Sequence, residues 1–213
     1  GSPVIGWMHD LERMHIDELK RWYQSWYAPN NATLIIVGDI DAGQVKTLAT
    51  RYFGPIARRE LPAIKPPLEL RAPGERTITQ YIEHQVPHLT LMFNVPSLST
   101  QTDLRTAPAL ELLSELLGGG NSSRLKSGLL RGDELLVAVD SHYSGISRGD
   151  ELLSITATLN LEKPKPLSEV QEQILAVIES LKRTPPSTAD LERARTRIIA
   201  RHVFSRDDLQ SLA

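Results

Sequence analysis

Cysteine is absent from this sequence of 213 residues, and so are long apolar runs and a dominant charge of one sign. The lack of cysteine excludes disulfide bonds, thiolate nucleophiles and cysteine-rich zinc sites, although it leaves the redox compartment open. No apolar run approaches the roughly 20 residues that a membrane-spanning helix requires. The 24 basic and 26 acidic side chains give a net charge of −2. Without a broad positive field to attract phosphate backbones, we expect no nucleic-acid partner. The lack of a long apolar run predicts that no segment spans a membrane.

Residues 1–60 carry the pattern of a helix–strand–helix unit. A first helix is expected over residues 16–27, because acidic side chains occupy its first turn and aromatic residues recur at a spacing of four. The apolar run 34–37 predicts a buried strand, and Asp41 can cap a second helix. Prolines then crowd the chain. Because proline lacks a donor and favours extended backbone, residues 61–75 are predicted to be a semi-rigid linker between two domains.

The remaining segment, residues 76–213, alternates between strand-like and helix-like spacing. The expected strands cover residues 76–84, 89–95, 135–139 and 152–159. The expected helices begin at Thr106, at Ser122 or Ser123, near Ser168 with a capping box to Gln171, and at Ser187 or Thr188. The order ββααββαα predicts an α+β fold in which an antiparallel or mixed sheet has helices packed on one face.

Two patterns in this segment have both a structural and a functional interpretation. The glycine triplet 118–120 follows a helix and lacks the rest of a nucleotide-binding loop. We therefore interpret it as a helix C-cap that uses the positive φ open to glycine. Arg193, Arg197 and Arg201 recur every four residues and could face an acidic partner, but acidic neighbours favour a solvated helix face.

Five segments, which follow one another over nearly the whole chain, carry a resemblance to a known family. They are "LKRWYQSWYAPNNATLIIVGDID", "RYFGPI", "LLGGGNSSRL", "GLLR" and "LERARTRI". With them the chain resembles the pitrilysin/insulinase family of zinc metallopeptidases, which includes the mitochondrial processing peptidase. The resemblance implies the processing-peptidase/LuxS-like metallohydrolase fold. In that fold, repeated α+β modules joined by linkers enclose a chamber that holds an extended peptide.

The resemblance also implies that zinc lies elsewhere. In the family, an H-x-x-E-H motif of the first module supplies two zinc ligands and the general base, and none of the six histidines here stands in such a motif. Residues 1–60 are then the tail of a zinc-bearing module, and residues 76–213 are most of the following non-catalytic module, incomplete at its C-terminus. We expect no catalytic residue, metal ligand or cofactor in this segment, with zinc in a longer parent protein. The two parts could close as one permuted domain.

One residue pair of the family can be sought in this chain. Family enzymes hold substrate with an arginine and, seven residues later, a tyrosine of a non-zinc module. Arg131 of "GLLRGDELLVAV" matches the arginine, whereas Ala138 stands at the tyrosine position. Arg131 is therefore the candidate substrate-binding residue. The alternative is a structural ion pair with Asp133 or Glu134.

The function implied by the resemblance is that of a non-catalytic segment of a zinc-dependent endopeptidase. It would form part of the peptide-binding chamber and the contact to a second family subunit or a second copy. The alternative is a structural or assembly subunit without proteolytic activity. A lone module that binds peptides by adding a strand to a sheet edge is a third possibility. The bacterial periplasm or cytoplasm is favoured over the mitochondrion.

Overall fold

The computed structural model describes residues 5–63, 74–83 and 86–207, and the chain divides into two compact units. One unit comprises residues 1–66 together with 205–213, and the other comprises residues 67–204. Among the described residues, no helix combines the length and the apolar character that crossing a bilayer demands. Each unit is described by itself below.

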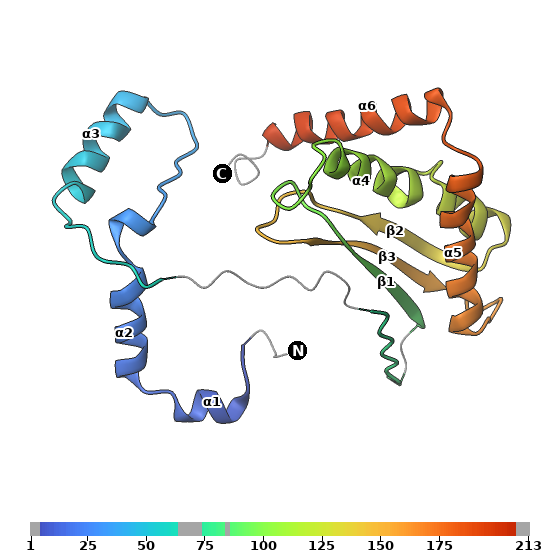
Figure 1. Cartoon of the computed structure of the whole chain (residues 1–213), viewed down its shortest axis with the longest axis horizontal. Coiled ribbons are helices and arrows are strands. Elements are labelled where there is room, and N and C mark those ends of the chain that lie inside the picture. Colours follow the sequence, from blue (N-terminus) through green and yellow to red (C-terminus); the bar gives the residue numbers. More distant parts are fainter. Residues whose placement is uncertain (1–4, 64–73, 84–85, 208–213) are drawn as a thin grey trace. The chain divides into compact units, whose positions relative to one another are not determined.

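The first unit is built from short helices (Figure 1). They are α1 (Met8–Arg13), α2 (Ile16–Trp26), the 3-10 turn Pro29–Asn31 and α3 (Ala42–Phe53). The helices expected over residues 16–27 and after Asp41 are therefore confirmed. The Asp41 carboxylate accepts a hydrogen bond from the backbone N–H of Gln44 at 2.8 Å, which satisfies one of the free donors at the start of α3.

Long-range polar contacts hold the end of this unit against α2. The Asn30 side chain donates to the carbonyl oxygen of Arg59 and accepts from the Arg59 N–H, each at 3.1 Å. The Arg59 guanidinium also donates to the carbonyl oxygen of Gln24 at 3.1 Å. Because Arg59 satisfies free carbonyl groups near the end of α2, it acts there as a C-terminal cap.

The strand predicted over residues 34–37 is not formed, and that prediction is wrong. Leu34, Ile35 and Ile36 are about half exposed and belong to no β-ladder among the described residues. Ala28 is the only buried hydrophobic residue that the structure describes in the first 63 residues. A strand is stabilised by cross-strand hydrogen bonds and side-chain pairs, and the residues of this unit that the structure describes supply no neighbouring strand.

The second unit is a three-stranded sheet with helices. Its strands are β1 (His88–Val95), β2 (Leu136–His142) and β3 (Glu151–Leu159). Its helices are α4 (Thr106–Ser114), the π-helices η2 (Glu115–Gly119) and η3 (Lys126–Gly132), α5 (Leu167–Arg183) and α6 (Thr188–Phe204). The expected strand 76–84 is wrong for residues 76–83, which form no strand, and residue 84 lies outside the described residues.

The sheet has the order β1-β3-β2, and both pairings are antiparallel. His88 lies opposite Thr158 and Val95 opposite Glu151, so β1 pairs with β3 along its whole length. The β2–β3 register is irregular between Leu136 and Ala138. The antiparallel sheet expected from the sequence is thus confirmed, with the last strand in the centre.

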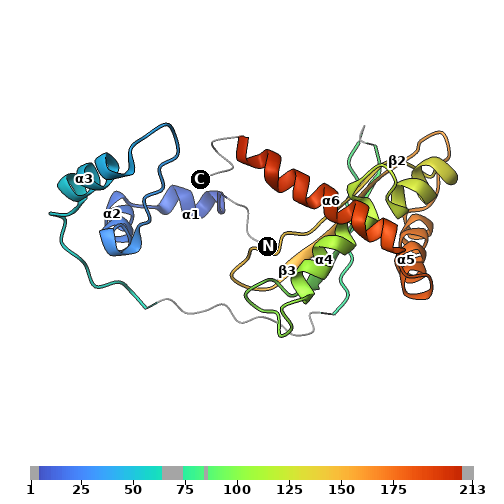
Figure 2. The ribbon, with the colours of Figure 1, turned by 90° about the horizontal axis from the view of Figure 1, so that it is seen from above.

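One face of the sheet carries the core. Alternate residues of β3 are buried (Leu153, Ile155, Ala157 and Leu159), as the two-residue period of a strand requires. Val170 and Ile174 of α5 are fully buried in the same cluster. Helices α4 and α6 lie side by side (Figures 1 and 2). The predicted α+β arrangement with helices packed on one face is confirmed.

The caps of the last two helices differ from each other. The predicted capping box from Ser168 to Gln171 is wrong, because α5 begins earlier and Pro166 precedes its first residue. Helix α6 does have reciprocal capping bonds, in which Ser187 N–H donates to the Asp190 carboxylate and Asp190 N–H donates to Ser187 Oγ. Hydrogen bonds from Ser187 lower the pKa of the Asp190 carboxyl.

The glycine triplet ends a helix, as expected, with Gly120 as the C-cap residue of η2, but its conformation differs from the expected one. None of Gly118, Gly119 and Gly120 has a positive φ, so the predicted left-handed cap is wrong. Gly118 is buried in η2, where an added Cβ would overlap with the backbone of Ser141 in β2. The absence of a side chain therefore lets the helix lie directly on the strand.

Gly118→Ala tests this close approach. We expect the substitution to lower the free energy of unfolding by at least about 2 kcal/mol, because the backbone of β2 cannot move aside as a flexible side chain would. Gly128→Ala is the matched control, since an added Cβ there has nothing within 4 Å. The control should raise stability by about 0.5–1 kcal/mol through helix propensity. Urea unfolding followed by circular dichroism measures both, and equal stability of the two variants would contradict the packing role.

Candidate functional site

Arg131, the candidate substrate-binding residue, lies in the last turn of η3 and is exposed. Its guanidinium donates to Ser127 Oγ at 2.9 Å, one turn earlier in the helix. The alternative ion pair with Asp133 or Glu134 is not formed. Glu134 instead pairs with Lys163, whose hydrogen bond lowers the pKa of the Glu134 carboxyl. One weak local contact leaves most of the donors of Arg131 available to a ligand.

Ala138 occupies the position where the family resemblance leads one to expect tyrosine. It lies in β2, is exposed and pairs with Thr158 of β3. A methyl group has neither donor nor acceptor. Arg131 therefore has no hydroxyl partner at this position for holding a peptide.

The strongest electrostatic feature of the second unit is a buried carboxylate. The side chain of Glu115, the first residue of η2, is only 3% exposed. Arg197 Nε donates to one carboxylate oxygen at 2.7 Å, and Arg201 Nη2 donates to the other. Because a buried charge is tolerated when it is paired and hydrogen-bonded, these arginines allow Glu115 to stay inside the fold. We call these three residues the Glu115 clamp.

The glycine triplet makes room for the Glu115 clamp. An added Cβ at Gly119 would overlap with the Glu115 carboxylate, and one at Gly120 would lie 2.5 Å from Arg197 Cζ. The expected solvated helix face is confirmed for Arg201, whose side chain is 62% exposed, but the expectation missed that Arg197 and Arg201 both pair with the buried Glu115 carboxylate. For Arg193 the expected acidic neighbour is present, since its guanidinium pairs with Asp190.

A pocket opens beside the clamp, between the residues that lead into η3 and helix α6. Its volume is about 220 Å³. Three arginines and three serines line it: Arg124, Arg193, Arg197, Ser122, Ser123 and Ser127. Asp190 is the only acidic residue in the lining. We call it the arginine pocket. It was not predicted from the sequence, although "SSR" and the spacing of the α6 arginines are signals of it.

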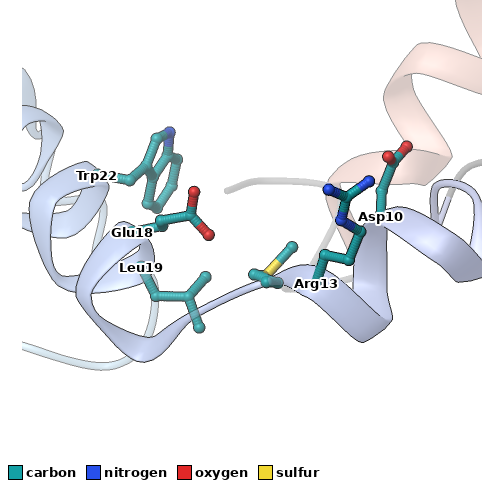
Figure 3. A pocket seen from close by; sticks show the side chains of 6 residues that line it. Asp10, Arg13, Glu18, Leu19 and Trp22 are labelled. Atoms are coloured by element: carbon teal, nitrogen blue, oxygen red, sulfur yellow. The ribbon is translucent and has the colours of Figure 1, made fainter.

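A second hollow, of about 570 Å³, belongs to the first unit. Asp10 and Arg13 of α1 and Glu18, Leu19 and Trp22 of α2 line it (Figure 3). This lining mixes charged and apolar side chains and includes no histidine or hydroxyl nucleophile. It offers no recognisable catalytic arrangement.

A zinc site is not offered by the part of the chain that the structure describes. Over residues 5–63, 74–83 and 86–207, no three His, Asp or Glu side chains gather into a group that could hold a metal ion. Zinc in proteins takes three or four such ligands. The described residues therefore do not fit zinc, and no step of a reaction can be assigned to them through it.

Glu115→Gln tests the Glu115 clamp. The amide keeps the size of the side chain but removes the charge that balances Arg197 and Arg201, so we expect a loss of about 2 kcal/mol in the free energy of unfolding. Glu111→Gln, one turn earlier in α4, is the control, because Glu111 is partly exposed and lies 3.4 Å from its ion-pair partner His202. The control should change stability by less than about 0.5 kcal/mol. Urea unfolding distinguishes the two, and a silent Glu115→Gln would contradict the clamp.

Comparison with known proteins finds relatives that are zinc proteases of one peptidase family. A family model described as the peptidase M16 inactive domain matches residues 13–198, which lie in both units. The chain is 27% identical over 194 residues to the zinc protease PqqE of Helicobacter pylori. The aligned residues are 90% of this chain and 42% of that protein. The chain thus spans less than half the length of this relative.

Solved structures agree with this family match. The crystal structure of a protease from Helicobacter pylori has a TM-score of 0.81 at 25% identity, over 98% of this chain and 49% of that one. The peptidase M16 inactive domain from Pseudomonas fluorescens has a TM-score of 0.69 over 93% of this chain and 46% of that one, and at 19% identity it supports the fold alone. Because the family model covers most of its length, this chain belongs to the M16, or pitrilysin, family of peptidases and carries the inactive domain of that family.

Proposed function

We propose that this chain is a non-catalytic segment of a zinc-dependent endopeptidase, in which it forms part of the peptide chamber and the contact to a second subunit. The observation that carries the proposal is the match of residues 13–198 to the inactive domain of M16 peptidases. The chain covers 42% of the zinc protease PqqE, so the zinc-binding part of the proposed enzyme would lie in additional sequence.

The uncovered face of the sheet supports a role as a chamber wall. Thr90 and Met92 of β1 and Leu152 and Thr156 of β3 are exposed there, on the side opposite the buried core. Exposed apolar side chains on this face suit contact with the side chains of an extended peptide, and the exposed threonine hydroxyl groups can bond to the peptide backbone.

Arg131 is the residue that we propose to contact substrate. Its side chain is exposed and donates one hydrogen bond to Ser127. A guanidinium can donate two parallel hydrogen bonds to a peptide carboxylate or a pair of bonds to carbonyl oxygens. With Ala138 in place of the family tyrosine, Arg131 would act alone, and its contribution would be to substrate affinity.

The proposed lack of catalytic activity has a direct test on the isolated chain. Incubated with zinc and a quenched fluorescent peptide, the chain should hydrolyse the peptide no faster than buffer does, because its described residues offer no metal-ligand group. Hydrolysis that a chelator abolishes would contradict the non-catalytic assignment.

The proposed role of Arg131 is tested in the complete enzyme that contains this chain. Arg131→Ala should raise KM for a peptide substrate about tenfold and leave kcat within about twofold, since it removes binding shared by ground and transition states. Arg105→Ala is the matched control, because Arg105 is an exposed arginine of the same unit that pairs with Asp103. An unchanged KM, or equal effects of both substitutions, would remove Arg131 from the site. Absence of any peptidase activity in the unsubstituted complete protein would favour the structural or assembly subunit instead.

A further inference from the structure

We propose that the arginine pocket binds a small oxyanion, a carboxylate or phosphate group. The pocket lies between residues 122–127 and helix α6, both in the second unit. This inference goes beyond the proposed peptidase role, because the pocket lining includes neither Arg131 nor the open sheet face; Ser127, which accepts a hydrogen bond from Arg131, is the residue that connects the two sites.

The charges around the pocket are unbalanced. Arg124, Arg193, Arg197 and Arg201 lie in the pocket or the adjoining clamp, and they meet two carboxylates there, those of Glu115 and Asp190. Arg124 has no carboxylate partner among the described residues and donates only to the carbonyl oxygen of Thr184, at 3.3 Å. An anion in the pocket would offset this positive excess.

The guanidinium groups are held in place before any ligand arrives. Arg197 is fixed by Glu115, and Arg193 is fixed by Asp190, which is itself bonded to Ser187 at the start of α6. Side chains that are already ordered lose little entropy when they bind, so an anion gains more from them than from free surface arginines. The remaining donors of each planar guanidinium suit the oxygens of a carboxylate or phosphate.

Ser123 supplies a second, independent indication. The residue lines the pocket and is 2% exposed, yet its Oγ has no hydrogen-bond partner among the described residues. A buried hydroxyl without a partner is costly. A rotation of the Ser123 side chain toward the pocket would give this hydroxyl an anion oxygen as acceptor. Ser122 and Ser127 add two further hydroxyl groups to the lining.

The size of the pocket limits the ligand. A volume of about 220 Å³ admits a carboxylate or phosphate group together with a few attached atoms, but it does not admit a nucleotide or a long peptide segment. The pocket would therefore capture the charged end of a ligand. The free ion is consequently a suitable probe.

Titration of the 213-residue chain with sodium phosphate and, separately, sodium acetate tests the site. Dissociation constants are measured by isothermal titration calorimetry at constant ionic strength. Arg193→Gln and Arg124→Gln should each weaken binding about tenfold, since each removes one charge-assisted hydrogen bond. Arg195→Gln is the matched control, because Arg195 also lies on α6 but pairs with Glu192 and does not line the pocket.

Ser123→Ala provides a separate readout. It should leave the anion-free protein at least as stable as before, because it removes a buried hydroxyl that has no partner, yet weaken anion binding about fivefold. Circular dichroism verifies that each variant is folded. Saturable binding of either probe that shows this pattern supports the site, and the tighter probe identifies the ligand as carboxylate or phosphate. The absence of saturable binding of both probes, or an equal loss in Arg195→Gln and Arg193→Gln, would overturn the proposal.

Discussion

The second unit depends on the burial of one negative charge. Glu115 stands where α4 passes into η2, and it is held by Arg197 and Arg201, which lie more than 80 residues further along the chain. Removing a guanidinium partner from a carboxylate in this position would be strongly destabilising, because a buried charge is tolerated when it is paired. The pairing therefore fixes α6 over η2, and through η2 it fixes α6 relative to β2. Glycine at positions 119 and 120 leaves the space that the Glu115 carboxylate and the Arg197 guanidinium occupy, so a side chain there would displace the clamp.

This dependence explains which features could be predicted from the sequence. Helices α2 and α3 and the sheet strands β1, β2 and β3 follow from local periodicity and caps, and they were correctly expected. The strands predicted at residues 34–37 and 76–83 are not formed. An apolar run or alternation shows that a segment can pair as a strand, but it does not show that a neighbouring strand is present. The Glu115 clamp was missed for a related reason, since its partners are distant in sequence and no short motif joins them.

The candidate site shows the same limit. Arg131 was identified through a family pattern, and its local ion pair was wrongly expected because Glu134 bonds to Lys163 from a later loop. The arginines of α6 were recognised from their spacing of four residues. That spacing could not reveal that Arg197 and Arg201 pair with the buried Glu115, or that Arg193 and Arg197 line a pocket. In this inactive M16 domain, a single helix face thus serves both the packing of the fold and a concave positive surface.

The order of strands also determines when the sheet can form during synthesis. The central strand β3 is the last of the three in the sequence, and within the described part of the chain β1 and β2 bond to no other strand. Until Glu151–Leu159 has left the ribosome, β1 has no partner for its eight residues, and the closure of this non-local pair must wait. The nascent chain consequently exposes an unpaired apolar strand for the time needed to make more than 50 further residues. A chaperone that binds extended apolar segments would have its best opportunity in that interval.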